Sequence, residues 1–192
     1  MSAPVEPDRP FAGRVAFITG AAHGQGRAVA LALAESGADI VAFDVAAKIE
    51  YPAYAQGSGA ELDSLVAEVH ALGRRALAFV GDVRDSAAIQ QAVDAAVAEF
   101  GRIDVLFNNA AVCPSRSGFL DVSDADWAQT MNVNLLGYVR MARAVLPHMI
   151  AAKRGRVVAI GGTYGHKGVA NAAIYAASKW ALRGLVKSAA LE

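Results

Sequence analysis

Short runs of β-branched and aromatic residues alternate with longer amphipathic stretches along most of this chain. The short runs predict five strands, over residues 14–19, 39–44, 76–80, 103–108 and 156–160. The amphipathic stretches predict helices over 25–36, 60–72, 86–100, 124–154 and 174–192, most of them closed by a glycine. Nearly continuous apolar strands that alternate with helices are typical of a parallel sheet covered on both faces. The pattern therefore predicts a doubly wound α/β fold in three layers.

The longest predicted helix begins after Ser123, which has capping-box spacing with Asp126. Its apolar positions are expected to share one buried face: Trp127, Met131, Leu135, Tyr138, Ala142, Val145 and Met149. Pro147 lies inside this helix and is expected to bend or loosen its last turns.

Composition indicates one domain and a small-molecule partner. The chain has 192 residues, of which 55% are hydrophobic, and a formal net charge of +0. We expect a flexible arm over residues 1–12 and one domain over 13–192. Without net positive charge or a polybasic segment, neither a nucleic acid nor a membrane surface is expected as a partner. The arm lacks the apolar core of a signal peptide, and no apolar run approaches the roughly 20 residues that span a bilayer.

Cys113 is the one cysteine of the sequence, so it has no partner for an internal disulfide. A single thiol fits a reducing compartment, and we expect a cytoplasmic protein. No basic residue or histidine lies beside Cys113 in the sequence. A buried, structural cysteine is therefore favoured over a nucleophile.

A glycine-rich turn separates the first predicted strand from its helix. Gly20, Gly24 and Gly26, with His23 and Gln25 between them, allow positive φ angles and a close backbone approach. The helix that follows directs its free N–H groups and positive dipole end at the same place. We interpret the turn as a pyrophosphate-binding loop of a Rossmann-like dinucleotide site. The alternative is a glycine-rich turn that holds no ligand.

Asp44 ends the second predicted strand, 24 residues after Gly20. A carboxylate at this place accepts hydrogen bonds from the hydroxyls of the adenosine ribose. It would repel a 2′-phosphate, and no arginine follows it directly to offset that charge. The cofactor is therefore predicted to be NAD, with a helix-capping or surface aspartate as the alternative.

Tyr175 and Lys179 lie four residues apart and so share one helical face. A lysine ammonium close to the phenol would favour the tyrosinate and lower a reference pKa of about 10 towards working pH. The pair would then serve as a general acid or base. Taken alone, such a pair is also common on solvated helix faces.

These motifs occur with Asp82-Val83, Asn108-Asn109-Ala110 and Asn134, and together they resemble the short-chain dehydrogenase/reductase family from about Gly13 onward. The resemblance implies that Asp82 and Val83 flank the adenine and that Asn108, Asn109 and Ala110 line the cofactor floor. It also implies a catalytic group of Asn134, Tyr175 and Lys179. In that group Tyr175 exchanges the proton, Lys179 holds the nicotinamide ribose and Asn134 positions a water. No metal is implied.

The asparagines also have purely structural interpretations. Asn108 and Asn109 could bond neighbouring strands, and Asn134 could do no more than perturb its helix.

Gly162 occupies the position, thirteen residues before the tyrosine, at which the family carries a catalytic serine. Two alternatives stay open: the site lacks this hydroxyl, or the adjacent Thr163 supplies it. Loss of one polarising donor costs on the order of 10²–10³ in rate, which slows catalysis without abolishing it.

The sequence ends at Glu192 on the tyrosine helix, whereas the family continues with a sixth strand and a loop that covers the substrate. We therefore expect a shortened copy with an open nicotinamide end, an exposed sheet edge and a tendency to associate. By the same resemblance, the long helix and the tyrosine helix would pair with those of a second subunit. A homodimer or homotetramer is the predicted assembly.

The long segment from Val45 to Gly59 resembles that of the carveol-dehydrogenase-like subset of the family, whose members hold NAD tightly. A flexible surface insertion is the alternative.

The motifs jointly predict an NAD-dependent oxidoreductase that interconverts a secondary alcohol and a ketone. The principal alternative is a catalytically impaired nucleotide-binding or scaffold protein of the same fold. A doubly wound methyltransferase is disfavoured, because it has no use for the Tyr175 and Lys179 pair.

Overall fold

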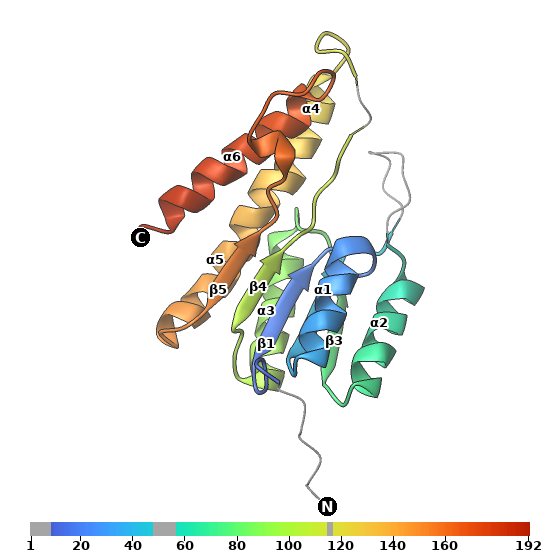
Figure 1. Ribbon diagram of the computed structural model, residues 1–192, viewed down its shortest axis with the longest axis vertical. Helices are drawn as coiled ribbons and strands as arrows, with labels where there is room; N and C mark the ends of the chain where they lie inside the picture. Colours follow the sequence, from blue (N-terminus) through green and yellow to red (C-terminus); the bar gives the residue numbers. More distant parts are fainter. Residues whose placement is uncertain (1–8, 48–56, 115–116) are drawn as a thin grey trace, which may run out of the picture.

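Five parallel strands form the centre of the computed structural model, which describes residues 9–47, 57–114 and 117–192 (Figure 1). The strands are β1 (Val15–Thr19), β2 (Asp39–Asp44), β3 (Ala76–Val80), β4 (Val105–Asn108) and β5 (Arg156–Ala159). The helices are α1 (Gly24–Glu35), α2 (Gly59–Ala71), α3 (Ser86–Phe100), α4 (Asp124–Met131), α5 (Tyr138–Ala151) and α6 (Ala173–Ala189). A π-helical segment η1 (Asn132–Gly137) joins α4 to α5, and a 3₁₀ turn η2 (Thr163–Gly165) precedes α6.

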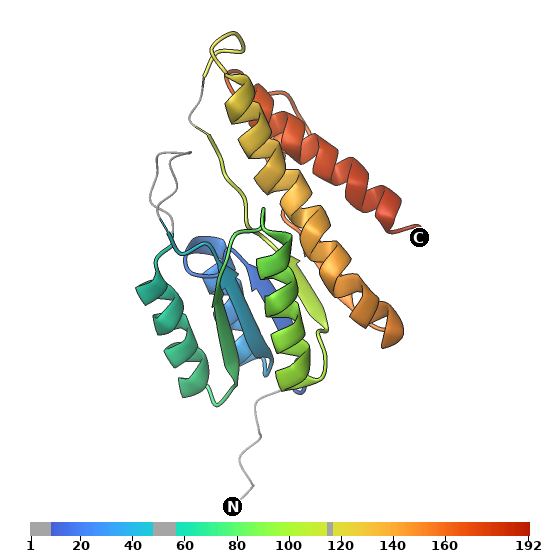
Figure 2. The same cartoon turned by 180° about the vertical axis from the view of Figure 1, so that it is seen from behind.

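The sheet has the strand order β3-β2-β1-β4-β5. Helices α1 and α2 cover one face, and α3 and α5 cover the other (Figures 1 and 2). The chain winds outward from β1 in one direction through β2 and β3, and in the other through β4 and β5. The carboxyl ends of β1 and β4 therefore flank the point where the winding reverses, which is where such folds bind ligands. The predicted doubly wound α/β fold is confirmed.

Two hydrophobic clusters fill the spaces between the layers. Phe17 and Phe43 project from β1 and β2 towards α3 and α5, with their ring centroids 6.2 Å apart. Their strand neighbours Ile18 and Ile40 project to the opposite face and pack against α1 and α2. Because both faces are covered, every residue of β1 and β2 is buried.

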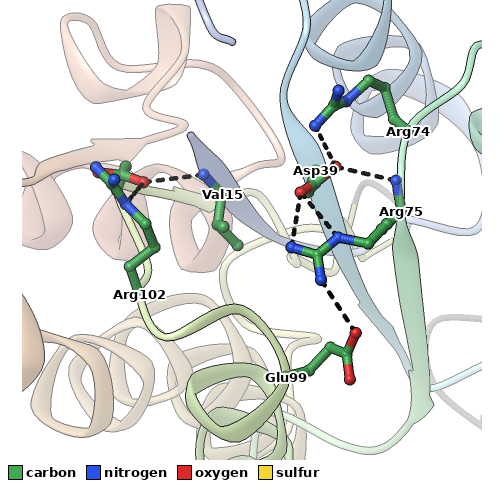
Figure 3. A network of polar contacts seen from close by, with 7 residues as sticks. Val15, Asp39, Arg74, Arg75, Glu99 and Arg102 are labelled. Atoms are coloured by element: carbon green, nitrogen blue, oxygen red, sulfur yellow. Dashed lines mark hydrogen bonds and ion pairs between the residues drawn. The ribbon is translucent and has the colours of Figure 1, made fainter. Parts of the chain in front are cut away.

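Ion pairs hold the amino ends of the strands. The Asp39 carboxylate accepts hydrogen bonds from Arg74 at 2.6 Å and from the Arg75 amide at 3.0 Å, as Figure 3 shows. Asp104 accepts from the Val15 amide at 2.9 Å and pairs with Arg102. Burial alone would raise the pKa of Asp104, but hydrogen bonds from Arg102 and Val15 and the positive charge around it hold that pKa below its usual value. These charges are satisfied at the amino ends, which leaves the carboxyl ends for a ligand.

The π-helical segment changes the buried face predicted for the long helix. Ala142, Val145 and Met149 are buried as expected, whereas Leu135 is only half-buried. The buried positions before α5 are instead Thr130, Val133, Asn134 and Gly137. A π turn holds one more residue than an α turn and so rotates the positions that face the core. The prediction of one continuous face was wrong in this half, and the rotation turns Asn134 inward.

Two predicted segments lie partly outside the described residues. Residues 1–8 of the predicted arm are outside, whereas residues 9–12 contact the domain: the Phe11 amide donates to the Ser36 carbonyl at 2.9 Å. Of the segment from Val45 to Gly59, residues 48–56 are outside, and at its end Ser58 caps α2 in a capping box with Glu61. Helix α5 continues through Pro147 to Ala151.

Candidate functional site

A cavity of about 270 Å³ opens at the carboxyl ends of the strands. Most of the predicted site residues line it: Gly20, His23, Gly24, Gln25, Asp44, Asp82, Val83, Asn109, Ala110, Tyr175 and Lys179. Gly26 and Asn134 lie behind this wall and support it. The structure thus brings together residues that span more than 150 positions of the sequence.

The glycine loop lets α1 approach the strand end closely. Gly20 has a φ of +66°, and its amide donates to the Phe43 carbonyl at 2.9 Å. A Cβ atom on Gly26 would overlap the Gly20 carbonyl and lie 2.9 Å from Asn109 Nδ2. At the start of α1, His23 makes no side-chain cap and the first turn carries no acidic residue. This helix end is therefore suited to an anionic group.

Asp44 and His23 meet at the far end of the loop. Asp44 is 4% exposed, so it is not the surface aspartate of the alternative interpretation. Its carboxylate oxygens accept from the amides of Ala22 and Ala46, each at 2.9 Å, and keep further lone pairs. His23 Nδ1 is buried, and no hydrogen-bond partner for it lies among the described residues. The Asp44 carboxylate on this cavity wall fits the hydroxyls of a ribose, whereas His23 lines the wall with Nδ1 turned into the protein.

Arg84 and Gln129 extend the wall beside Asp82, and sequence reasoning missed both. The Arg84 guanidinium binds both oxygens of Asp82 and donates to Gln129 Oε1 at 2.6 Å. Burial would raise the pKa of Asp82, but the hydrogen bonds and charge of Arg84 lower it. The position of Arg84, two residues after Asp82, was a signal for this pair. Gln129 gave none, because it lies on α4.

The remaining wall residues that sequence reasoning missed lie at or after strand ends or come from the long helix: Phe43, Val45, Gly81, Ala111, Val112, Val133 and Ile160.

Thr19 and the two asparagines connect β1 to β4 below the cavity. The Thr19 hydroxyl donates to Asn108 Oδ1 at 3.2 Å and accepts from the amides of Asn109 and Ala110, both at 3.0 Å. Asn108 also donates to the Tyr138 carbonyl and does not line the cavity, which agrees with its structural interpretation. Asn109 lines the cavity and also has a structural role, because its Nδ2 donates to the carbonyls of Thr19 and Gly20.

Asn134 is held by three hydrogen bonds. Its Oδ1 accepts from the Val112 amide at 2.7 Å, and its Nδ2 donates to the Val112 carbonyl at 2.9 Å and to Ser178 Oγ at 3.1 Å. Ser178 is fully buried and donates in turn to the Tyr175 carbonyl at 2.7 Å. Both amide hydrogens of Asn134 are therefore used within the protein. The side chain ties η1 to the residues after β4 and to α6, a contact through Ser178 that sequence reasoning missed.

Lys179 is 2% exposed and lies beside Tyr175 on α6. Its Nζ donates to the Ile160 carbonyl at 2.7 Å and lies 5.5 Å from the centroid of the Tyr175 ring. Burial lowers the pKa of Lys179 to about 8, and the charge of the nearby Cys113 offsets only part of this effect. The lysine thus keeps its proton near neutral pH, close to a phenol that can exchange one.

Tyr175 also lines a second, smaller cavity of about 90 Å³, and among the described residues it is the one that borders both cavities. Cys113 and Tyr164 line this smaller cavity as well. Cys113 is exposed, so the expectation of a buried cysteine was wrong. It follows the end of β4 at the rim of the site, where no core surrounds it.

Gly162 and Thr163 contribute no hydroxyl to either cavity. Gly162 has a φ of +117°, and Thr163 is exposed and lines neither the larger nor the smaller one. The suggestion that Thr163 replaces a serine is therefore not supported by its placement.

Residues 9–47, 57–114 and 117–192 form neither a metal site nor a membrane span. Within these ranges, no three His, Cys, Asp or Glu side chains gather in a way that could hold a metal ion. No helix in the described ranges has the length and apolarity needed to span a membrane.

Comparison with known proteins identifies relatives over most of the chain. The short chain dehydrogenase family model matches residues 14–192. The (-)-trans-carveol dehydrogenase of Rhodococcus erythropolis is 39% identical over 181 residues, which are 94% of this chain and 65% of that protein. The chain thus spans slightly less than two thirds of the length of this curated relative.

Solved structures with bound NAD share the fold. The crystal structure of carveol dehydrogenase from Mycobacterium avium in complex with NAD superposes with a TM-score of 0.86 at 36% identity, over 91% of this chain and 63% of that one. A short chain dehydrogenase from Mycobacterium paratuberculosis bound to NAD gives a TM-score of 0.87 at 37% identity, over 93% and 66%.

Proposed function

Because the chain belongs to the short-chain dehydrogenase family, we propose that it is an NAD-dependent oxidoreductase that interconverts a secondary alcohol and a ketone. The observation that carries this proposal is the place of Tyr175, which lines both the large cavity and the small one and has Lys179 beside it. A proton donor between the larger cavity, which the glycine loop and Asp44 line, and a smaller one suits hydride transfer with coupled proton transfer.

The glycine loop and Asp44 would hold the cofactor. The uncapped start of α1 suits the pyrophosphate, and Asp44 suits the adenosine ribose. Burial of the Asp44 carboxylate strengthens its repulsion of a 2′-phosphate, which favours NAD over NADP. The two similar structures that contain NAD support this choice.

Residues of α6 would carry out the proton transfer. Bound NAD supplies the hydride acceptor or donor. Tyr175 would take the proton from the alcohol or give it to the ketone, and the nearby Lys179 ammonium favours the negative form of the phenol. Asn134 and Ser178 would keep Tyr175 in place through the hydrogen bond to its carbonyl.

A catalytically impaired nucleotide-binding or scaffold protein remains the second candidate. The observation that favours it is Gly162, which carries no hydroxyl where the family has its serine. Measurable turnover of any alcohol would count against this candidate.

The first experiment compares the wild type with Tyr175→Phe. The purified chain is titrated with NADH and with NADPH by nicotinamide fluorescence, and NAD reduction is followed with a panel of secondary alcohols that includes carveol. We expect saturable NADH binding in both proteins and loss of most turnover in the variant. Tyr138→Phe serves as the control, because Tyr138 lies on α5 and lines neither cavity. Unchanged turnover in Tyr175→Phe would refute the mechanism.

The substrate is expected to be a small alcohol or ketone rather than a nucleic acid or a membrane lipid. Association into a homodimer or homotetramer and a cytoplasmic location stay predictions. Sedimentation of the purified chain tests the first of them.

A further inference from the structure

The turn after β5 lacks a hydroxyl where one would polarise the reacting oxygen. Gly162 has no side chain, and apart from its chain neighbours no atom of the described residues lies within 4 Å of the place that a Cβ would occupy. Thr163 is exposed and lines neither cavity. A second hydrogen-bond donor to the reacting oxygen would therefore have to come from another group.

Tyr164 is the hydroxyl-bearing residue of this turn that does reach the site. It is half-buried and lines the smaller cavity together with Tyr175. The two rings meet edge to face, with centroids 5.3 Å apart and an interplanar angle of 81°. Both tyrosines therefore border the space that a small substrate would enter.

The turn is fixed against the helix that carries Tyr175. Gly165 is buried, and a Cβ there would lie 3.1 Å from the Lys179 carbonyl oxygen, so the turn packs directly on the α6 backbone. The Gly165 amide donates to the Gly162 carbonyl at 3.0 Å, and its carbonyl accepts from Arg183 at 3.4 Å. Tyr164 thus has little freedom to move away from Tyr175.

We propose that the Tyr164 hydroxyl donates a hydrogen bond to the reacting oxygen of the substrate and so takes the part that Gly162 cannot take. This inference rests on the proposed function. In ketone reduction the carbonyl carbon gains hydride from NADH and the oxygen gains the proton of Tyr175. Tyr164 keeps its own proton throughout and stabilises the charge that develops on the oxygen.

Tyr164→Phe removes the hydroxyl and keeps the ring contact with Tyr175. Thr163→Val is the matched control, because it removes the neighbouring hydroxyl, which lies outside both cavities. We measure kcat and KM with carveol, affinity for carvone in the presence of saturating NAD, and NADH affinity. For Tyr164→Phe we expect kcat/KM to fall about 10²-fold, the lower end of the loss for one polarising donor. Carvone should bind more weakly, and NADH binding and the melting temperature should not change.

Three results would overturn the inference. Kinetics and carvone affinity of Tyr164→Phe within twofold of the wild type would limit Tyr164 to ring packing. An equal loss in Thr163→Val would assign the donor to Thr163. If the wild type neither turns over carveol and the other alcohols nor binds carvone, the proposed function fails and the inference fails with it. An active wild type with an unaffected Tyr164→Phe rejects the inference alone.

Discussion

Replacing Lys179 by methionine should stabilise the fold while it reduces activity. Lys179 is 2% exposed, and within the described part of the chain its Nζ makes one hydrogen bond, to the Ile160 carbonyl at 2.7 Å. An ammonium group in this place has lost most of its water without gaining a carboxylate partner within the described residues. Methionine has a similar length and no charge, so it fills the same space without this cost.

The cost follows from the pKa of Lys179, which burial lowers from 10.5 to about 8. At about 1.4 kcal/mol for each pKa unit, the fall corresponds to about 3 kcal/mol of destabilisation near neutral pH. Loss of the hydrogen bond to the Ile160 carbonyl reduces this gain in stability by about 1 kcal/mol. We therefore expect Lys179→Met to gain about 2 kcal/mol, or about 4–8 °C in melting temperature for a domain of this size.

The stability gained by Lys179→Met should decrease as the pH rises. Below a pH of about 8, Lys179 is protonated in both the folded and the unfolded state, and the full cost applies. Between about 8 and 10.5 the unfolded chain binds a proton that the folded protein has released, so the stability of the wild type rises with pH. The advantage of the variant should therefore shrink by about 2 kcal/mol between pH 7 and pH 9.5.

Urea unfolding of both proteins without NAD, at a series of pH values, measures these differences. Lys187→Met, on the exposed side of α6, controls for the loss of one lysine charge. Turnover of Lys179→Met should fall, because Tyr175 loses the nearby ammonium. A variant that is less stable than the wild type near pH 7, or an advantage that does not change with pH, would refute the argument that the buried ammonium is costly.

Three further predictions concern the cofactor cavity and the ion pairs of the sheet. Asp44→Ser should weaken NADH binding and admit NADPH, because the buried like charge is removed; an unchanged preference in fluorescence titrations would contradict this. Gly26→Ala should abolish NADH binding, since its Cβ would overlap the Gly20 carbonyl, whereas Gly59→Ala, with nothing within 4 Å, should bind as the wild type does. Asp104→Asn should lose about 2 kcal/mol of stability near pH 7, because the hydrogen bonds to a charged carboxylate are weakened. Because hydrogen bonds and positive charge hold the pKa of the Asp104 carboxyl below its usual value, that loss should shrink as the pH falls through this lowered pKa and the folded wild type takes up a proton; urea unfolding that gives the same loss at neutral and at strongly acid pH would count against it.

The strands and the helix caps could be predicted from the sequence because they depend on residues that are close together in the chain. Strands β2 and β3 and helix α3 have the bounds that their apolar runs and flanking residues predict. Ser123 and Asp126 form the capping box that their spacing indicates. Burial on both faces makes strands nearly continuous in apolar residues, and this signal is strong over four or five positions.

Positions in the second half of the long helix were also predicted correctly, but those in the first half were not. The prediction assumed 3.6 residues per turn throughout, and η1 breaks that period between Asn132 and Gly137. A hydrophobic pattern alone does not reveal such a turn, because it is stabilised by contacts with other elements. Here those contacts include the hydrogen bonds of Asn134 to Val112 and Ser178.

By itself, the sequence determined the doubly wound fold, the glycine loop and the positions of Asp44, Tyr175 and Lys179, because each depends on the order of strands and on short spacings. Tertiary structure alone decided which side chains meet at the site. It joined Arg84 to Gln129 across 45 positions and Asn134 to Ser178 across 44, left Thr163 exposed and set Tyr164 against Tyr175. Contacts of this kind depend on how whole elements pack. Side-chain packing between distant segments produces no periodic pattern in the sequence.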